Sequence, residues 1–119
     1  RMVERFEKFG KPIHITEIGA TSGPTNETVF NNSRGIPKDP YDWRRPWDEE
    51  LQADWLEEVY TIYYSRPLTK AINWYDFSDF RPFIVNGGIV RKDTSPKMSF
   101  DRLKNLLNGW NRLPGQFTK

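Results

Sequence analysis

The chain has 119 residues, the length of one domain at most, and its 18 basic and 16 acidic residues leave a net charge of +2. The two signs are interleaved, so no basic patch for nucleic acid or an anionic membrane stands out, and no window approaches the roughly 20 apolar residues of a membrane span. Cysteines are absent and there is a single histidine, which excludes disulfides and thiol chemistry and leaves only a carboxylate-rich metal site open. We expect no metal and no cofactor.

Residues 1–10 carry apolar side chains at helical spacing, and Gly10 supplies a stop signal, so this segment is typical of the end of a helix. The run 13–17 follows at once and predicts a short strand that ends in the carboxylate of Glu17. In parallel α/β folds, chemistry sits at the carboxyl ends of the strands. Glu17 is therefore the first candidate for a functional residue, against the alternative of a solvated carboxylate that opens a loop.

Strict alternation along this strand places Glu17 on one face with Ile13 and Ile15. His14 and Thr16 then lie on the other face. On this pattern we expect His14 to be packed under a helix rather than to take part in catalysis.

Residues 18–47 form a long irregular segment that is rich in Gly, Pro, Asn and Ser. Loops of this length without regular structure are uncommon and are usually functional or disordered, and the aromatic residues near its end favour a folded, functional loop. Trp43 and Trp47 leave two alternatives open. They pack within the loop, or they form a platform on which a sugar ring stacks.

Asp48 predicts the start of a helix, because its side chain can cap the first turn and the two glutamates after it favour the helix dipole. Apolar residues recur at helical spacing through residues 51–65, and Pro67 ends the segment. This stripe consists of Leu51, Trp55, Val59 and Ile62, widened by Leu56 and Tyr63.

A strand is expected next, at residues 70–75, and alternation requires Trp74 and Tyr75 to point to opposite faces of it. Two carboxylates follow in the loop after this strand. Asp76 and Asp79 either form the acid pair of a site, or they have a loop-capping or arginine-pairing role, with Arg81 and Arg91 as the available partners.

The last predicted element is a helix that begins with Ser95 as N-cap and Pro96 at its first position, after a turn at Gly87 and Gly88. Its apolar stripe consists of Phe100, Leu103, Leu107 and Trp110, with Leu106 alongside. The predicted order of the chain is thus helix end, strand, long loop, helix, strand, loop and helix.

Two successive strand–helix units predict parallel strands with helices on one side, but two strands alone leave both edges and one face uncovered. A (β/α)8 barrel needs about 250 residues and carries its chemistry on the loops after its strands. We therefore predict that the chain is the C-terminal portion of a TIM barrel. Residues 1–10 would end helix six, 11–66 would form unit seven and 67–119 unit eight.

Three stretches resemble the C-terminal part of family 10 glycoside hydrolases, the endo-1,4-β-xylanase family. The sequence Ile-His-Ile-Thr-Glu-Ile at 13–18 resembles the seventh-strand motif that ends in the catalytic nucleophile. Residues 52–67 and 71–79 resemble the seventh helix and eighth strand. The Gly-Gly-Ile-Val run at 87–90, followed by Pro-Lys-Met-Ser-Phe at 96–100, resembles the closing turn and the start of the last helix.

This resemblance implies that Glu17 is the nucleophile and that Tyr75, inside the barrel, Asp79 and Phe83 bind substrate. It also implies an extracellular or periplasmic hydrolase whose substrate is a β-1,4-linked plant polysaccharide such as xylan. Tyr75 stands where the family usually has Trp, and Asp76 where it has Gly, which marks a divergent member.

A retaining mechanism needs a second carboxyl group as acid/base, which the family carries on strand four. That strand lies outside this sequence, so the chain alone is expected to be inactive. Its expected partners are the polysaccharide and the missing N-terminal barrel units, in the same precursor or as another chain. Two alternatives remain open: a non-catalytic carbohydrate-binding or scaffold fragment, and another retaining (β/α)8 glycosidase family.

Overall fold

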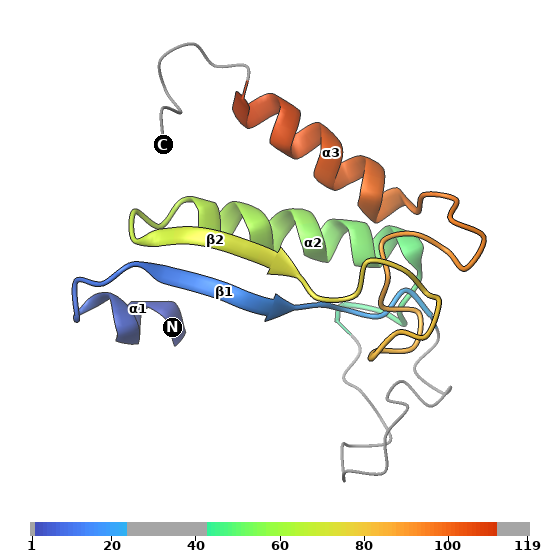
Figure 1. Cartoon of the computed structure of the whole chain (residues 1–119), viewed down its shortest axis with the longest axis horizontal. Helices are drawn as coiled ribbons and strands as arrows, with labels where there is room; N and C mark the ends of the chain where they lie inside the picture. The colour runs from blue at the N-terminus through green and yellow to red at the C-terminus, as the bar shows by residue number, and fades with distance from the viewer. Residues whose placement is uncertain (1, 24–42, 112–119) are drawn as a thin grey trace, which may run out of the picture.

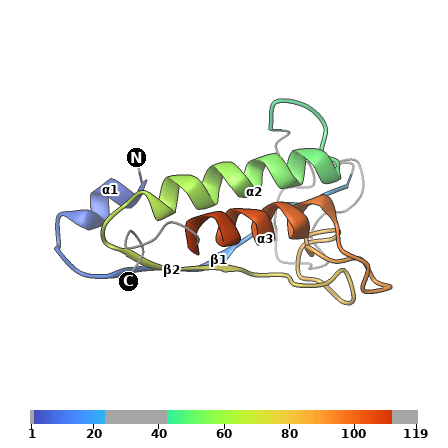
Figure 2. The same ribbon diagram turned by 90° about the horizontal axis from the view of Figure 1, so that it is seen from above.

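A computed structural model describes residues 2–23 and 43–111 of the chain (Figure 1). Its elements are helix α1 (Met2–Glu7), strand β1 (Ile13–Ile18), helix α2 (Glu49–Tyr64), strand β2 (Thr69–Trp74) and helix α3 (Met98–Asn111). The two strands are parallel neighbours, and α2 and α3 lie on the same side of them (Figures 1 and 2). The described part is therefore a small α/β unit, with element types and order as predicted. Of its three helices, none has the length and apolar character of a bilayer-spanning segment.

Helix α2 starts where the sequence predicts, because Asp48 caps it. The Asp48 side chain accepts a hydrogen bond from the Leu51 N–H at 2.7 Å and is also bonded to Arg45. These bonds, the one from Arg45 first, lower the pKa of Asp48. The helix ends at Tyr64, with Ser65 as its C-cap and Pro67 two residues further on.

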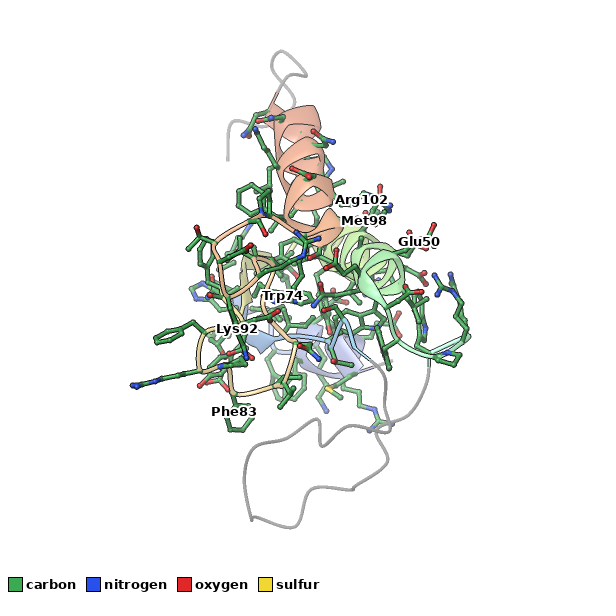
Figure 3. The ribbon with its side chains drawn as sticks, turned by 90° about the vertical axis from the view of Figure 1, so that its right-hand side faces the viewer. Glu50, Trp74, Phe83, Lys92, Met98 and Arg102 are labelled. Atoms are coloured by element: carbon green, nitrogen blue, oxygen red, sulfur yellow. The ribbon has the colours of Figure 1, made fainter. Side chains whose placement is uncertain are left out.

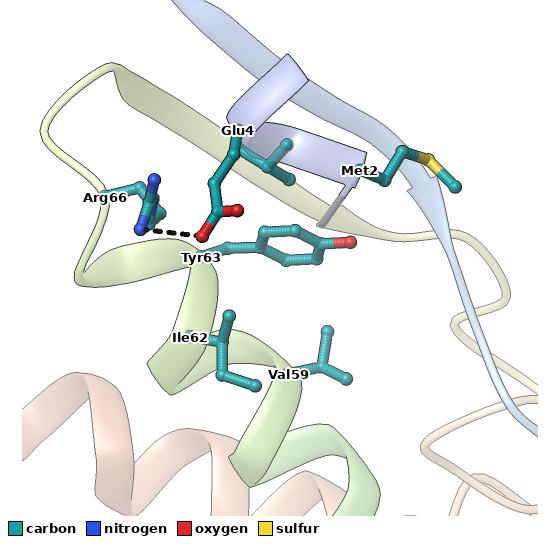
Figure 4. A pocket seen from close by; sticks show the side chains of 7 residues that line it. Met2, Glu4, Val59, Ile62, Tyr63 and Arg66 are labelled. Atoms are coloured by element: carbon teal, nitrogen blue, oxygen red, sulfur yellow. Dashed lines mark ion pairs between the residues drawn. The ribbon is translucent and has the colours of Figure 1, made fainter. Parts of the chain in front are cut away.

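The buried face of α2 differs from the predicted stripe. Residues toward the sheet and α3 are buried, namely Leu51, Gln52, Ala53, Leu56 and Tyr60. Ile62 is exposed, while Val59 and Tyr63 are half-buried and face α1 across a 170 Å³ hollow (Figure 4). Arg66, at the far end of the helix, pairs with Glu4 and Glu7 of α1. The predicted stripe therefore combined two faces of the helix.

Helix α3 begins at Met98, two residues later than predicted. The Ser95 side chain bonds Asp93 rather than the first helical turn, and Pro96 is held in an isolated bridge with Val90. The first turn instead begins at the Lys97 carbonyl, which accepts a hydrogen bond from the Phe100 N–H at 3.1 Å. Leu107, placed in the predicted stripe, is exposed.

Strand β1 does not follow strict alternation. Ile15 pairs with Ile72 and Ile18 pairs with Trp74, so three steps along β1 match two steps along β2. This is the register change of a β-bulge, and it leaves Thr16 and Glu17 both exposed. Glu17 nevertheless lines one hollow beside β1 together with Ile13 and Ile15.

His14 is also exposed in the described structure, which contradicts the expectation that it packs under a helix. It lines a 640 Å³ hollow beside β1, whose apolar wall includes Phe6 and Phe9 of the N-terminal segment. Gly10 ends that segment with a φ of +63°, as its sequence position predicts.

Candidate active site

The loops that follow β1 and β2 lie at one end of the sheet, on the right in Figure 1. Glu17 is the penultimate residue of β1, and Tyr75 directly follows β2. The Tyr75 N–H donates to the Ile18 carbonyl at 2.8 Å, which ties the two strand ends together. The backbones of the predicted nucleophile and of the predicted sugar contact are therefore neighbours.

The carboxylate of Glu17 is exposed, and none of the residues in 2–23 and 43–111 forms a hydrogen bond or ion pair with it. Most other acidic side chains of the described residues form ion pairs with arginines or accept hydrogen bonds from backbone N–H groups. A nucleophile has to remain accessible to the carbon that it attacks, and the position of Glu17 meets that requirement.

Tyr75 and Phe83 form an aromatic corner at the same end of the sheet. Their ring centroids are 5.7 Å apart at an interplanar angle of 81°, and the side chains are 49% and 48% exposed. Figure 3 shows Trp74 near the middle of the molecule and Phe83 at its lower edge, away from α2 and α3. The two aromatic residues border a 560 Å³ hollow that also includes Arg81. Partly exposed rings of this kind can pack on the apolar face of a pyranose.

The two aspartates of the loop after β2 have internal partners. Asp76 accepts hydrogen bonds from the N–H groups of Phe83 and Ile84 at 3.0 and 2.9 Å. Asp79 accepts one from the Gly88 N–H at 2.9 Å and forms an ion pair with Lys97 at 2.8 Å. The structure therefore supports the loop-capping alternative for both carboxylates, although the basic partner of Asp79 is a lysine and not Arg81 or Arg91.

The tryptophans before α2 pack in series with those of the core. Trp43 stacks on Trp47 at 6.4 Å, Trp47 meets Trp55 edge-on at 6.5 Å, and Trp55 meets Trp74 at 6.0 Å. Trp47 is buried in a cluster with Ala20 and Leu51, and the guanidinium of Arg44 lies 4.0 Å from the Trp43 ring centroid. Of the two alternatives, packing within the protein holds for Trp47, because its ring is buried. Contact with a sugar ring stays a prediction for Trp43, which is half-buried.

Sequence reasoning missed two buried polar side chains, Gln52 and Lys97. Gln52 donates to the Ala20 carbonyl at 2.8 Å and accepts from the Ser99 hydroxyl at 2.8 Å, so it links the loop after β1 to the start of α3. Lys97 bonds Ser22 and Asp79, and burial lowers its pKa although Asp79 opposes that shift. The one feature of the sequence that could have indicated a buried polar contact is the position of Gln52 next to Leu51, at the start of the apolar face of α2.

The glycine pair of the second loop allows one stability prediction. A Cβ at Gly88 would lie 2.5 Å from the Ser78 carbonyl carbon and 2.6 Å from the Asp79 nitrogen, both backbone atoms. We expect Gly88→Ala to reduce the free energy of unfolding by about 1–3 kcal/mol, measured by thermal melting. The matched control is Gly109→Ala in α3, where nothing lies within 4 Å of the added methyl. It should increase stability by about 0.5–1 kcal/mol, and equal effects at the two sites would contradict the packing described for Gly88.

Taken together, the described residues offer an exposed carboxylate near the end of β1, in the hollow that Phe6 and Phe9 also line, and an aromatic corner that follows β2. The nearby aspartates are engaged within their own loop, and no group of three His, Asp or Glu side chains suited to a metal ion occurs in the described ranges. The arrangement can supply a nucleophile and a surface for a sugar ring. A retaining mechanism would need a second carboxyl group as acid/base.

No family model matches the chain, and a comparison with curated proteins finds no match. Solved structures do match. A Bifidobacterium dentium β-glucuronidase, in complex with coumarin-3-O-glucuronide, is 23% identical with a TM-score of 0.66, covering 91% of this chain and 16% of that one. Two structures of a GH2 β-galacturonidase from Eisenbergiella tayi also match. The glycerol complex is 25% identical with a TM-score of 0.57, covering 84% of this chain and 17% of that one.

The galacturonate complex of the same enzyme is 24% identical with a TM-score of 0.60, covering 91% of this chain and 20% of that one. The chain thus spans a fifth or less of the length of these structures. Because these three structures are of glycuronidases, two of them described as GH2, the resemblance to family 10 glycoside hydrolases is wrong. The described fold is that of a segment found in glycoside hydrolases, and the extracellular or periplasmic location remains a prediction without that support.

Proposed function

We propose that this chain is part of a retaining glycoside hydrolase of a (β/α)8 family other than family 10, and that Glu17 is its nucleophile. One observation carries the proposal: an accessible carboxylate stands at the carboxyl end of a parallel strand, in a unit whose structural neighbours are glycoside hydrolases. Active sites of (β/α)8 enzymes lie at that end of the strands.

The barrel assignment remains part of this proposal. Residues 1–10, 11–66 and 67–119 would be the end of helix six, unit seven and unit eight. In the described structure each strand has a single neighbour, and Phe6 and Phe9 are exposed beside β1. Preceding and following strands of a closed barrel would cover these edges, and they would also bring the acid/base. We propose that they come from the same precursor or from another chain.

For the substrate we propose a β-linked glycoside. The structural neighbours are a β-glucuronidase and a β-galacturonidase, so aryl β-glucuronides and β-galacturonides are the first substrates to assay, with neutral β-glycosides and xylan beside them. Asp79 is less suited to substrate binding than the sequence indicated, because both of its oxygens are engaged. Tyr75 and Phe83 are the proposed sugar contacts, and Trp43 is a further proposed contact.

The stereochemistry of hydrolysis tests the mechanism. In a retaining enzyme the two carboxyl groups lie about 5–5.5 Å apart and a covalent glycosyl-enzyme forms, so a β-glycoside first yields the β-anomer of the free sugar. Proton NMR of the first product, recorded before mutarotation, should show that anomer for the complete natural protein. An α-anomer as first product would exclude a nucleophilic role for Glu17. Sugar binding without any turnover would favour a non-catalytic carbohydrate-binding fragment.

Tyr75→Ala tests the aromatic corner. The lost ring should raise KM by about tenfold, which corresponds to about 1.4 kcal/mol of binding, while kcat changes less. Steady-state kinetics on an aryl β-glycoside measures both. Phe80→Ala, which removes a more exposed ring of the same loop outside this corner, is the control and should leave KM unchanged. Equal KM values for the two variants would remove Tyr75 from the sugar site.

A further inference from the structure

The buried lysine at the start of α3 has no role in the function proposed above. Lys97 is 2% exposed, and its ammonium reaches three oxygens: Asp79 Oδ2 at 2.8 Å, the Ser22 hydroxyl at 2.8 Å and the Asn86 carbonyl at 3.1 Å. An ammonium has three N–H donors, so these three acceptors satisfy it completely. We call Lys97 with these three partners the Lys97 clamp.

The clamp joins three segments that are distant in sequence. Ser22 belongs to the loop after β1, Asp79 and Asn86 belong to the loop after β2, and Lys97 directly precedes α3. Burying a charge is costly unless it is paired and hydrogen-bonded, so the ion pair holds its geometry only while all three segments remain in place. The lysine therefore couples the position of one strand-end loop to that of the other.

The loop after β1 is fixed at nearly every residue between the clamp and Glu17. The Ser22 N–H donates to the Asn86 carbonyl at 2.9 Å, and the Thr21 hydroxyl donates to the Val85 carbonyl at 2.9 Å. Gln52 holds the Ala20 carbonyl from α2, and the Ile18 carbonyl accepts from the Tyr75 N–H. Glu17 comes directly before this fixed segment.

Nothing in the described structure links Lys97 to the Glu17 carboxylate itself. We propose, resting on the function proposed above, that Lys97 is a positioning residue. Through Ser22 and Asn86, Lys97 fixes the position of the segment that follows β1. It thereby fixes the orientation of the Glu17 side chain near the end of that strand. A displacement of about 1 Å in a reacting group can cost a hundredfold in rate, so this restraint bears on kcat more than on substrate binding.

The main test is the double variant Asp79→Asn with Lys97→Met in the complete natural protein. It removes both charges with little change of volume, whereas Lys97→Met alone leaves Asp79 buried without its counter-ion and is expected to unfold more readily. Ser22→Ala is the milder variant, because it removes one acceptor of the clamp and no charge. Lys104→Met, an exposed lysine of α3, is the matched control.

We expect kcat on an aryl β-glycoside to fall about tenfold to a hundredfold in the double variant and severalfold in Ser22→Ala, with KM within about twofold of the wild-type value. Rates are taken per mole of folded protein. Lys104→Met should leave both constants unchanged. Wild-type kcat in both clamp variants, or a fall that Lys104→Met shares, would overturn the proposal.

A second readout does not depend on turnover. Amide hydrogen exchange of residues 17–23 should become faster in the double variant and in Ser22→Ala, and stay at the wild-type rate in Lys104→Met. Unchanged exchange in this segment would overturn the positioning role even if the proposed function holds. Conversely, faster exchange in a protein that hydrolyses no glycoside would retain the clamp as a restraint on the loop and reject the proposed function.

Discussion

Glu17→Gln in the complete natural protein is expected to lower kcat on an activated aryl β-glycoside by about three decades or more, while substrate binding stays close to wild type. The amide keeps the size of the side chain but cannot attack the anomeric carbon, so the covalent route is lost. About 4 kcal/mol of transition-state stabilisation corresponds to such a loss. Steady-state assays give kcat, and calorimetric titration with an unreactive glycoside gives the affinity for substrate.

Two controls separate a lost nucleophile from a damaged fold. Asp101→Asn makes a carboxylate-to-amide change on the exposed surface of α3 and should leave kcat unchanged. Glu17→Ala should recover turnover when azide is added, because a small anion can enter the vacated space and attack from the same side. Full activity in Glu17→Gln would remove Glu17 from the mechanism, whatever the Asp101 variant does.

The second large effect concerns the 119-residue chain expressed alone, which is expected to be inactive on β-glycosides and to self-associate. Several large apolar side chains are exposed in the described structure, namely Met2, Phe6, Phe9, Phe77, Phe80 and Phe83. Each strand also has one unpaired edge among the described elements. Such faces and edges pair with other chains when their own partners are missing.

Size-exclusion chromatography with light scattering measures the association, and an assay on aryl β-glycosides measures the activity. Addition of the further barrel units proposed above, made as a separate chain, should shift the mass to a stoichiometric complex and restore turnover. A monodisperse monomer that melts cooperatively would contradict the need for further units. Efficient hydrolysis by that monomer would mean that a second carboxylate lies within residues 1–119.

Local sequence signals were sufficient for the order and type of the elements. Asp48 as N-cap, Pro67 beyond the helix end and Gly10 at positive φ each act through their own backbone neighbours, so their effects can be read from the sequence alone. The parallel pairing of β1 and β2 followed from the strand–helix order. The two strands and the two long helices lie within two residues of their predicted limits, whereas α1 ends at Glu7, three residues before Gly10.

Features that depend on distant partners were missed. The bulge in β1 is defined by its register with β2, and no pattern within residues 13–18 reveals it. Serine is a favoured N-cap residue, but the Ser95 hydroxyl donates its hydrogen bond to Asp93 and does not cap α3. Lys97 looks like a solvated helix-start lysine until Ser22 and Asp79 are brought to it from two other loops.

The candidate site was predictable in part for the same reason. The position of Glu17 at a strand end is a local property, whereas its orientation and its neighbours depend on pairing with β2. Short strand-end motifs indicated a glycoside hydrolase, yet they assigned the wrong family, because a few residues at strand ends are too short a pattern to separate one family from another.

Trapping of the covalent intermediate tests the central claim most directly. A 2-deoxy-2-fluoro β-glycoside with a good leaving group reacts in the first step of a retaining mechanism, but its fluorine slows hydrolysis of the glycosyl-enzyme. After incubation with the complete natural protein, proteolysis and tandem mass spectrometry should find the fluorosugar on the peptide that contains residues 12–23, attached to Glu17. A label on another carboxylate, or complete inactivation with Glu17 unmodified, would contradict the assignment.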